Sequence, residues 1–406
     1  MKTQEAVLDV LGKLQSEDLS VFPYRCVVMR NRNASCLRCA QACTSGAISV
    51  TDDALEVDPD LCVGCGTCAT VCPTCALEAR HPNDAALYQR AARAREANGG
   101  AAVVVCDAKW EAVGGRIDPE KVARVTCLGR VEESLLVGLV ADGASSVRLV
   151  HGSCGECPRN AACETYPLVA ETANLLLETW DAPVRVELSE KLPASVRLER
   201  PLGAEVSPAL AYDEGKRQMF SQLGAAAGEA VASGLAEGDG VGAAEEPESG
   251  ARQAARFMKV MTDGTLPHFL PDRRERLLDA LAVLGDPADV ALDTRLWGRV
   301  TIDVDACKSC YMCATFCPTG AIRKFAGGED AGVEHIPGDC VKCRCCTDVC
   351  PTDALTLHED VMAREVLAGA VVERMVLPPV TDDRGGAHSM IGALRKIIHC
   401  DQLYER

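Results

Sequence analysis

The sequence predicts an α+β, multidomain chain in which two cysteine-rich modules flank a small α/β domain with a largely parallel sheet. Two observations predict this class. The 406 residues include 24 cysteines, and all but Cys400 fall in three groups, at residues 26–75, 106–163 and 307–350. In the middle group, apolar runs typical of buried strands alternate with a helical pattern, which favours a parallel sheet.

The composition excludes some classes of function. The net charge is −17 and no run of Lys or Arg occurs, so we do not expect nucleic-acid binding. An acidic surface fits a partner with a basic docking face, and it equally serves solubility alone. Aromatic residues make up only 4% of the chain, which suits small modules organised by metal better than one large core.

The N-terminus and the apolar runs give no sign of export or of a membrane span. The opening segment MKTQEAVLDVLGKL lacks a basic start followed by a continuous apolar core, so it is not a signal peptide. No apolar run reaches the roughly 18 residues of a membrane helix. We therefore expect a cytoplasmic protein whose cysteines bind metal rather than form disulfides.

The C-terminal cysteine group contains one motif twice. Residues 307–317 and 340–350 both have the spacing C-x2-C-x2-C-x3-C, followed by proline. Three thiolates at this spacing can wrap three corners of an iron–sulfur cubane, while the fourth cysteine faces away and the proline turns the chain. Structural zinc is the alternative, but zinc sites use four ligands in two pairs rather than two interlocked sets of four.

Residues 299–361 resemble the bacterial two-cluster ferredoxins, with the β-prone segments RVTIDVD and AIRKF flanking the first motif. The resemblance implies two [4Fe–4S] clusters, because in that family the fourth cysteine of each motif binds the other cluster. The implied ligands are Cys307, Cys310, Cys313 and Cys350 for one cluster, and Cys340, Cys343, Cys346 and Cys317 for the other. Cys345 is surplus, and we expect it to pack nearby.

The N-terminal group, within residues 1–98, is a degenerate version of the same ferredoxin-like pair. Residues 62–72 carry the full motif. The partner half, NASCLRCAQACTSGAI, has Asn33 where the first cysteine should stand and Thr44 where proline should stand.

The ligands of this module follow from aligning the two halves. One [4Fe–4S] cluster should take Cys62, Cys65, Cys68 and Cys43. The other site has Cys36, Cys39 and Cys72. We favour Cys26 as its fourth ligand over a three-cysteine [3Fe–4S] site, and loss of this cluster is the remaining alternative. Cys75 is a spare or an alternative ligand.

The middle group, in residues 99–200, has a pattern that predicts strands ending in or near cysteines. AAVVVC ends in Cys106, ARVTC ends in Cys127, and SSVRLV leads to three further cysteines, while VEESLLVGLVADGA has helical spacing. The cysteines thus lie at the carboxyl ends of strands, where parallel sheets place their sites. His151 could be a ligand, but a hydrogen-bonded structural histidine is the commoner outcome.

This stretch resembles the iron–sulfur delta subunit of the methyl-viologen-reducing hydrogenase family, which links a hydrogenase to heterodisulfide reductase through a [2Fe–2S] cluster. The matching features are Cys106 with Trp110 close behind, VTCLGRVEE around Cys127, and GSCGEC after a strand. The family has several cysteines around the first position, whereas Cys106 stands alone here. The resemblance implies a [2Fe–2S] cluster on four of Cys106, Cys127, Cys154, Cys157 and Cys163. Structural zinc or an empty site are the alternatives.

The rest of the chain carries no metal motif. Residues 201–255 are rich in Ala, Gly and Glu and predict a flexible linker. Residues 256–298 are a helical segment, and 362–406 are a tail. The helical pattern rests on Leu277, Leu278, Leu281 and Leu284, and the tail's amphipathic helix on Met390, Ile391, Leu394, Ile397 and Ile398. Cys400 is expected to be a plain thiol.

The sequence contains redox centres but no recognisable place for substrate chemistry. It has no dinucleotide, Walker, nucleophile-elbow, zinc-protease or haem motif. We expect an oxygen-sensitive electron-transfer subunit with three to four [4Fe–4S] clusters and no catalytic residue. Its partner would be a hydrogenase, a heterodisulfide-reductase-like enzyme, a molybdopterin oxidoreductase or a flavoprotein. The alternatives are a catalytic oxidoreductase, acting on a thiol, disulfide or small oxidant at an irregular cluster, and a sensor or assembly factor.

Overall fold

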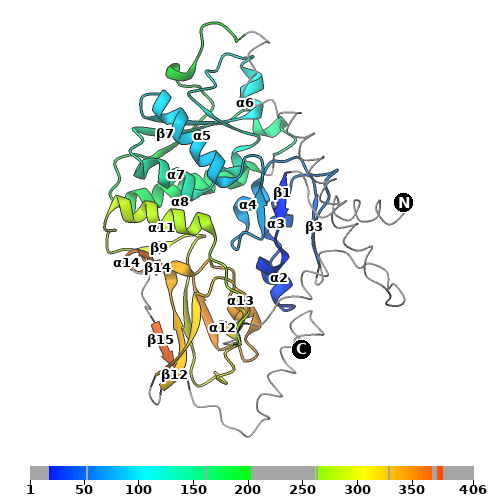
Figure 1. Cartoon of the computed structure of the whole chain (residues 1–406), viewed down its shortest axis with the longest axis vertical. Coiled ribbons are helices and arrows are strands. Elements are labelled where there is room, and N and C mark those ends of the chain that lie inside the picture. The colour runs from blue at the N-terminus through cyan, green and yellow to red at the C-terminus, as the bar shows by residue number, and fades with distance from the viewer. Residues whose placement is uncertain are drawn as a thin grey trace, which may run out of the picture.

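The structure of the chain, a computed structural model, describes residues 18–51, 54–160, 162–202, 261, 264–327, 330–367 and 373–377. In Figure 1 the middle domain lies at the top, the N-terminal module at the right and the C-terminal module at the bottom. The predicted tail helix and almost all of the predicted linker lie outside the described residues. Within them, no helix is both long and apolar enough to span a membrane.

The middle domain is built on a four-stranded, fully parallel sheet with the order β6-β5-β7-β8. The strands are β5 (Ala101–Cys106), β6 (Ala123–Val125), β7 (Ser146–Val150) and β8 (Val186–Ser189). The first three were predicted and the parallel sheet is confirmed, whereas β8 was not predicted. Period-2 alternation along β5 sends Ala102 and Val104 into the main core and Val103 and Val105 into a smaller core on the other face.

Helices cover the main core face of this sheet. They are α5 (Asp84–Ala97), α7 (Glu133–Ala141) and α8 (Ala162–Thr179), while the short α6 (Asp107–Ala112) follows β5 directly. Helix α7 coincides with the predicted helical run. Its side chains from Leu135 to Leu139 are all buried, as expected for a helix packed on a sheet and covered by further elements.

The two cysteine-rich modules have short antiparallel strands and short helices. In the N-terminal module β1 (Leu19–Val21) pairs with β4 (Leu77–Ala79), and β2 (Ile48–Val50) pairs with β3 (Leu55–Val57). Its helices are η1 (Pro23–Arg25), α2 (Val27–Arg30), α3 (Arg38–Gln41) and α4 (Thr67–Val71). In the C-terminal module β10 (Arg299–Ile302) pairs with β13 (Leu355–His358), and the helices are α12 (Met312–Phe316) and α13 (Cys345–Val349).

The C-terminal module also contains strands outside the predicted span of 299–361. Strand β12 (Asp330–His335) pairs with β11 (Ile322–Gly327) and with β15 (Glu373–Val376). Strand β14 (Asp360–Met362), followed by α14 (Ala363–Leu367), pairs with β9 (Ala291–Asp293). Segments before and after the motif region therefore complete this module.

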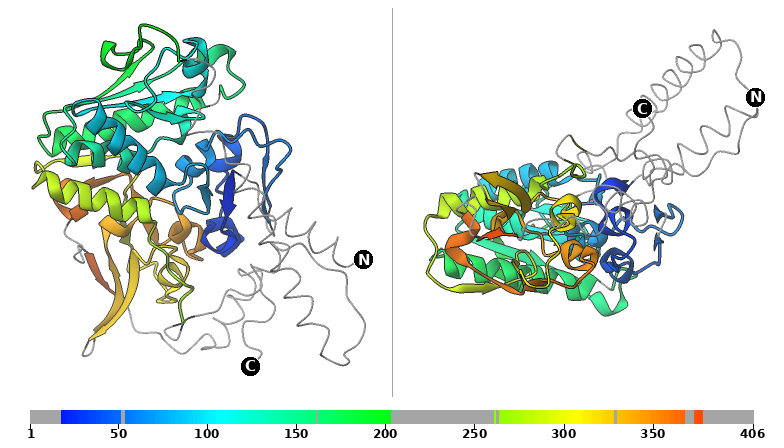
Figure 2. Two further views of the ribbon diagram at one scale, coloured as in Figure 1. Left: turned by 45° about the horizontal axis from the view of Figure 1, so that its top comes forward. Right: turned by 90° about the horizontal axis from the view of Figure 1, so that it is seen from below.

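Helix α11 (Asp272–Leu284), in the predicted helical segment, lies between the middle domain and the C-terminal module (Figures 1 and 2). Leu277 and Leu281 are buried in the same core as α7, and Leu278 and Leu284 pack against it. The leucine periodicity thus serves packing between modules, which keeps the middle domain and the C-terminal module in fixed positions.

The two cysteine-rich modules share one hydrophobic core. Met29 and Leu77 of the N-terminal module are buried together with Met312, Phe316 and Val349 of the C-terminal module. Because their core is continuous, the two modules form a single packed unit around their cysteines.

Candidate metal centres

The three complete C-x2-C-x2-C loops share one backbone pattern. In each loop, the residue just before the second cysteine and the residue just after it have positive φ. These residues are Ser309 (53°) and Tyr311 (57°), Lys342 (50°) and Arg344 (66°), and Gly64 (61°) and Gly66 (74°). Left-handed backbone costs a non-glycine residue about 1–2 kcal/mol, and such strain concentrates at functional sites. Such turns on either side of the second cysteine fit a loop that wraps a cubane.

A second left-handed position lies three residues after each fourth cysteine. It is Gly46 (68°), Gly320 (73°), Asp353 (52°) and Cys75 (49°) in the four half-motifs. Cys75 therefore occupies a turn position at which the equivalent residues are Gly or Asp. Its thiol is buried, and burial raises its pKa to about 12.

We number five groups of thiols from site I in the middle domain to site V in the C-terminal module. Site V is the thiol group of Cys307, Cys310, Cys313 and Cys350. Cys313 lies within α12 and Cys350 directly follows α13, so the packed pair α12–α13 brings the two motifs together. Burial, with smaller contributions from the thiols of Cys310 and Cys307, raises the pKa of Cys313 to about 12. Cys350 acts on Cys313 in the same direction. The structure thus gathers the four cysteines of the predicted set.

Site IV is the thiol group of Cys317, Cys340, Cys343 and Cys346. All four line one cavity in the C-terminal module. Burial raises the pKa of Cys346 well above its ordinary value, and Cys343 and Cys340 add to the effect. The surplus Cys345 is fully buried beside this site, with its Sγ 3.5 Å from the carbonyl oxygen of Phe316. It packs nearby, as expected.

Site II is the thiol group of Cys62, Cys65, Cys68 and Cys43 in the N-terminal module. Burial raises the pKa of Cys68 well above its ordinary value, and the neighbouring thiols of Cys65 and Cys62 raise it further. Cys43 also acts on Cys68, although it comes from the degenerate half. This is the interlocked arrangement that the motif spacing predicts.

Site III is the thiol group of Cys36, Cys39, Cys72 and Cys26. Burial, with smaller contributions from the thiols of Cys72 and Cys36, raises the pKa of Cys26 to about 12. Burial also raises the pKa of Cys39 to about 12, with smaller contributions from the thiols of Cys72 and Cys26. Cys26 therefore lies beside the three cysteines that lacked a partner. No residue between Cys36 and Cys39 has positive φ, so this half builds its loop differently.

Site I, in the middle domain, is the thiol group of Cys106, Cys127, Cys154 and Cys157. All four line a cavity at the carboxyl ends of β5, β6 and β7. Cys163 lies beside Cys154, which contributes to a pKa of about 11 for Cys163 after the larger effect of burial. His151 lines the same cavity, and its Nδ1 is 2.9 Å from the carbonyl oxygen of Gly152.

The surroundings of the sulfur atoms fit iron–sulfur clusters. Backbone N–H groups donate to Sγ of Cys72 (from Ala76, 3.2 Å), Cys350 (from Ala354, 3.3 Å), Cys307 (from Ser309, 3.4 Å) and Cys106 (from Gly152, 3.3 Å). Such hydrogen bonds set the potential of a bound cluster. Among the described residues, no three His, Cys, Asp or Glu side chains are placed to hold a single metal ion.

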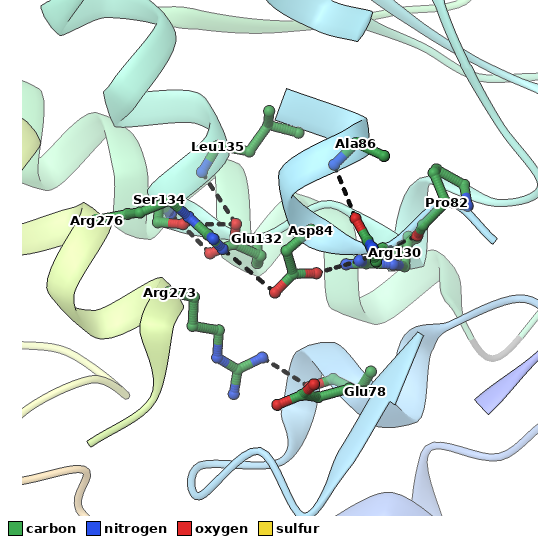
Figure 3. Close-up of polar contacts among 12 residues, drawn as sticks. Glu78, Pro82, Asp84, Ala86, Arg130, Glu132, Ser134, Leu135, Arg273 and Arg276 are labelled. Carbon is green, nitrogen blue, oxygen red and sulfur yellow. Dashed lines mark hydrogen bonds and ion pairs between the residues drawn. The ribbon is translucent and has the colours of Figure 1, made fainter. Parts of the chain in front are cut away.

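A polar network fixes the middle domain to its neighbours (Figure 3). Asp84, at the start of α5, pairs with Arg130 and lies 3.3 Å from Nη2 of Arg276 on α11. Glu132 caps α7 by accepting hydrogen bonds from backbone N–H groups of Ser134 (2.8 Å) and Leu135 (3.0 Å). Charged groups from three segments pair at this contact, which favours one fixed arrangement.

Comparison with protein families places two 4Fe–4S models on the chain. A 4Fe–4S dicluster domain matches residues 306–354, and a 4Fe–4S binding domain matches residues 55–78. The chain carries two 4Fe–4S ferredoxin-type domains. The first spans sites IV and V, and the second covers the complete motif of the N-terminal module. The predicted iron–sulfur character is thereby confirmed, and an iron–sulfur electron-transfer role is supported.

Two curated relatives are similar over short segments. A subunit of the ion-translocating oxidoreductase complex of Methanosarcina acetivorans is 42% identical over 45 residues, 11% of this chain and 17% of that protein. The hydrogenase-4 component A of Escherichia coli is 49% identical over 41 residues, 10% of this chain and 20% of that protein. The chain thus spans about a fifth or less of either relative. No solved structure matches it.

Proposed function

We propose that the chain relays single electrons through a series of iron–sulfur clusters to or from a separate redox enzyme. The observation that carries this proposal is the spatial order of the five thiol sites. Electrostatic and packing contacts between neighbouring thiols support the order I, II, III, IV, V. Clusters in such a row allow an electron to cross the whole molecule in short steps.

The contact between sites I and II joins the middle domain to the N-terminal module. The charge of Cys65 acts on Cys127, whose pKa is raised to about 12, mainly by burial. Nε of Arg159 donates to the carbonyl oxygen of Val63 in the site II loop (3.5 Å). A Cβ on Gly129 would collide with Thr67, so glycine permits this close approach.

The remaining contacts run through the cysteine-rich modules. Cys39 of site III acts on Cys68 of site II. Between sites III and IV lies Cys345, on which both Cys317 and Cys26 act. Sites IV and V are linked by the exchange of Cys317 and Cys350 between the two motifs. These contacts support an uninterrupted path.

The middle domain would be the end of the relay that faces another protein. Its resemblance to the hydrogenase delta subunit favours a [2Fe–2S] cluster at site I, with structural zinc as the alternative. The curated relatives are named as a component of hydrogenase-4 and a subunit of an ion-translocating oxidoreductase complex. We accordingly infer a redox enzyme of this general kind as the partner, with a hydrogenase or a heterodisulfide-reductase-like enzyme favoured.

Iron content and magnetic coupling test the relay. Anaerobically purified chain should contain between about 12 iron atoms, from three cubanes without iron in site I, and about 18, from four cubanes with a [2Fe–2S] cluster in site I. After reduction with dithionite, its EPR spectrum should show broadening from interacting clusters. Substantially less iron, or no signal from reduced clusters, would refute the relay.

A pair of adjacent cysteines supplies a matched control. Cys346→Ser should remove iron from site IV, because Cys346 is a proposed ligand, and should reduce the coupling between the clusters on either side. Cys345→Ser changes the neighbouring buried thiol and should leave the iron content unchanged. Equal iron loss in both variants would contradict the ligand set.

A catalytic role at site I is the second candidate. Cys154, Cys157 and Cys163 are partly exposed, and five thiols are present where a cluster needs four. A thiol left over beside a cluster could react with a disulfide. The test is whether the reduced chain reduces disulfides catalytically. If it does, and Cys163→Ser abolishes the activity while the cluster spectra persist, site I is catalytic rather than only a relay site.

A further inference from the structure

His335 is a buried histidine whose ring has no protein partner. It ends strand β12, is 0% exposed, and neither ring nitrogen has a hydrogen-bond partner among the described residues. The rings of His151, His268 and His358, by contrast, each contact an oxygen at 2.8–2.9 Å. A buried polar group without a partner costs about 1–3 kcal/mol, so such a group calls for an explanation.

The cavity beside His335 supplies that explanation. His335 lines the same cavity as the four thiols of site IV, together with the apolar side chains of Val300, Ile322 and Leu357. These apolar neighbours offer the imidazole neither a donor nor an acceptor, and the polar lining side chains Thr319 and Arg344 make no hydrogen bond to the ring. The sulfur atoms of a cluster held in site IV are the acceptors that this cavity would contain.

The equivalent positions in the other complete motifs are apolar. His335 stands five residues before Cys340, the first cysteine of its motif. The residues five before Cys62 and Cys307 are Val57 and Ile302, and each also ends a strand. The fold therefore accepts a β-branched aliphatic side chain at this position, and the histidine of site IV is not required by the architecture.

The protonation state suits a neutral hydrogen-bond donor. Burial, and to a smaller extent the charge of Arg299, lower the pKa of His335 to about 4. At neutral pH the ring therefore carries one N–H group and no charge. A neutral donor can bind to the sulfur of a cluster in either redox state.

We propose that His335 is a positioning residue that donates a ring N–H hydrogen bond to a sulfur atom of the cluster in site IV. Reduction adds negative charge to the cluster, so the bond strengthens on reduction and raises the potential of that cluster above the value it would have with an aliphatic neighbour. Site IV lies inside the row of sites, between III and V. The histidine thus makes this interior cluster easier to reduce than it would be with an aliphatic neighbour. This inference depends on the iron–sulfur relay proposed above.

Potentiometric EPR on His335→Val tests the inference, because valine is the residue found at the equivalent position 57. The variant should keep its iron, and one cluster should become harder to reduce by about tenfold in its equilibrium constant, equal to about 59 mV for one electron. His335→Gln, which restores an N–H donor, should recover part of the shift. The other clusters serve as internal controls.

A measurement on the unaltered chain covers the case in which a variant does not fold. With histidine labelled by nitrogen-15, pulsed EPR of the reduced chain should detect a histidine nitrogen coupled to one cluster, and Val substitution should remove it. Absence of this coupling, or unchanged potentials in a fully loaded His335→Val variant, overturns the inference and leaves the relay standing. Absence of reducible clusters in the unaltered chain would instead refute the relay itself.

Discussion

Arg30 joins the two cysteine-rich modules, and its replacement by methionine should separate them. The side chain is 1% exposed. Nε donates to the carbonyl oxygen of Phe316 (3.2 Å) and Nη2 to that of Cys317 (3.4 Å). Nη1 donates to the carbonyl oxygens of Pro267 (2.9 Å) and Tyr24 (3.2 Å). One guanidinium thus ties three chain segments together beside site IV.

The energetic effect of Arg30→Met follows from these four bonds. Hydrogen bonds from a charged donor contribute about 1.5 kcal/mol or more each, so their loss costs roughly 6 kcal/mol. Burial of the guanidinium opposes this, since it lowers the pKa of Arg30 below its ordinary value and costs a few kcal/mol that methionine would not incur. We expect a net loss of about 3 kcal/mol.

Cluster loss under anaerobic denaturation measures this effect. A loss of about 3 kcal/mol corresponds to roughly a hundredfold faster release of the clusters, if the contact is broken before release. Arg30→Lys keeps the charge but reaches fewer carbonyl groups, so its effect should be intermediate. Arg90, exposed on α5, provides a control variant, Arg90→Met, that should change nothing. Equal rates in Arg30→Met and Arg90→Met would refute the role of Arg30.

Three further substitutions have definite expected outcomes. Gly129→Ala should weaken the magnetic interaction between sites I and II in EPR, because its Cβ would collide with Thr67; an unchanged spectrum would argue against their adjacency. Cys75→Gly should leave iron content unchanged and relieve about 1 kcal/mol of left-handed strain, and a loss of iron would make Cys75 a ligand. Asp84→Asn should destabilise the chain in urea by about 2 kcal/mol. Burial would raise the pKa of Asp84, but Arg130 and other arginines hold it below its ordinary value, so the loss should be equal at pH 7 and pH 5 and shrink only below about pH 4.

The cysteine spacing made the loops and their partners predictable, because a repeated motif fixes local geometry. The resemblance to two-cluster ferredoxins implied that Cys317 and Cys350 belong to opposite sites, and the incomplete half-motif pointed to Cys26 as a further ligand. Local patterns of apolar residues likewise predicted the strand that ends in Cys106 and the helix that follows Cys127. They missed β8, whose sequence VELS is short and largely exposed.

Contacts between modules could not be predicted in this way. Arg30 donates to backbone carbonyl groups 286 and 287 residues away, and any residue supplies a carbonyl. The pairing of β15 with β12 likewise depends on backbone groups, and His335 belongs to no motif. Residues of this kind carry no signal in a single sequence, although they decide how the modules are placed.

The placement of the modules bears directly on function. Two independent ferredoxin-type domains on a linker would exchange electrons only on random encounter. Here Phe316 and Met29 share one core, and Cys345 is buried between sites III and IV. In the proposed relay, a fixed distance between the sites would make the rate of electron transfer a property of the fold rather than of chain motion. Arg30 donates to the carbonyl oxygen of Cys317 and His335 lines the cavity of site IV, so both side chains would act on the proposed relay at this interior site.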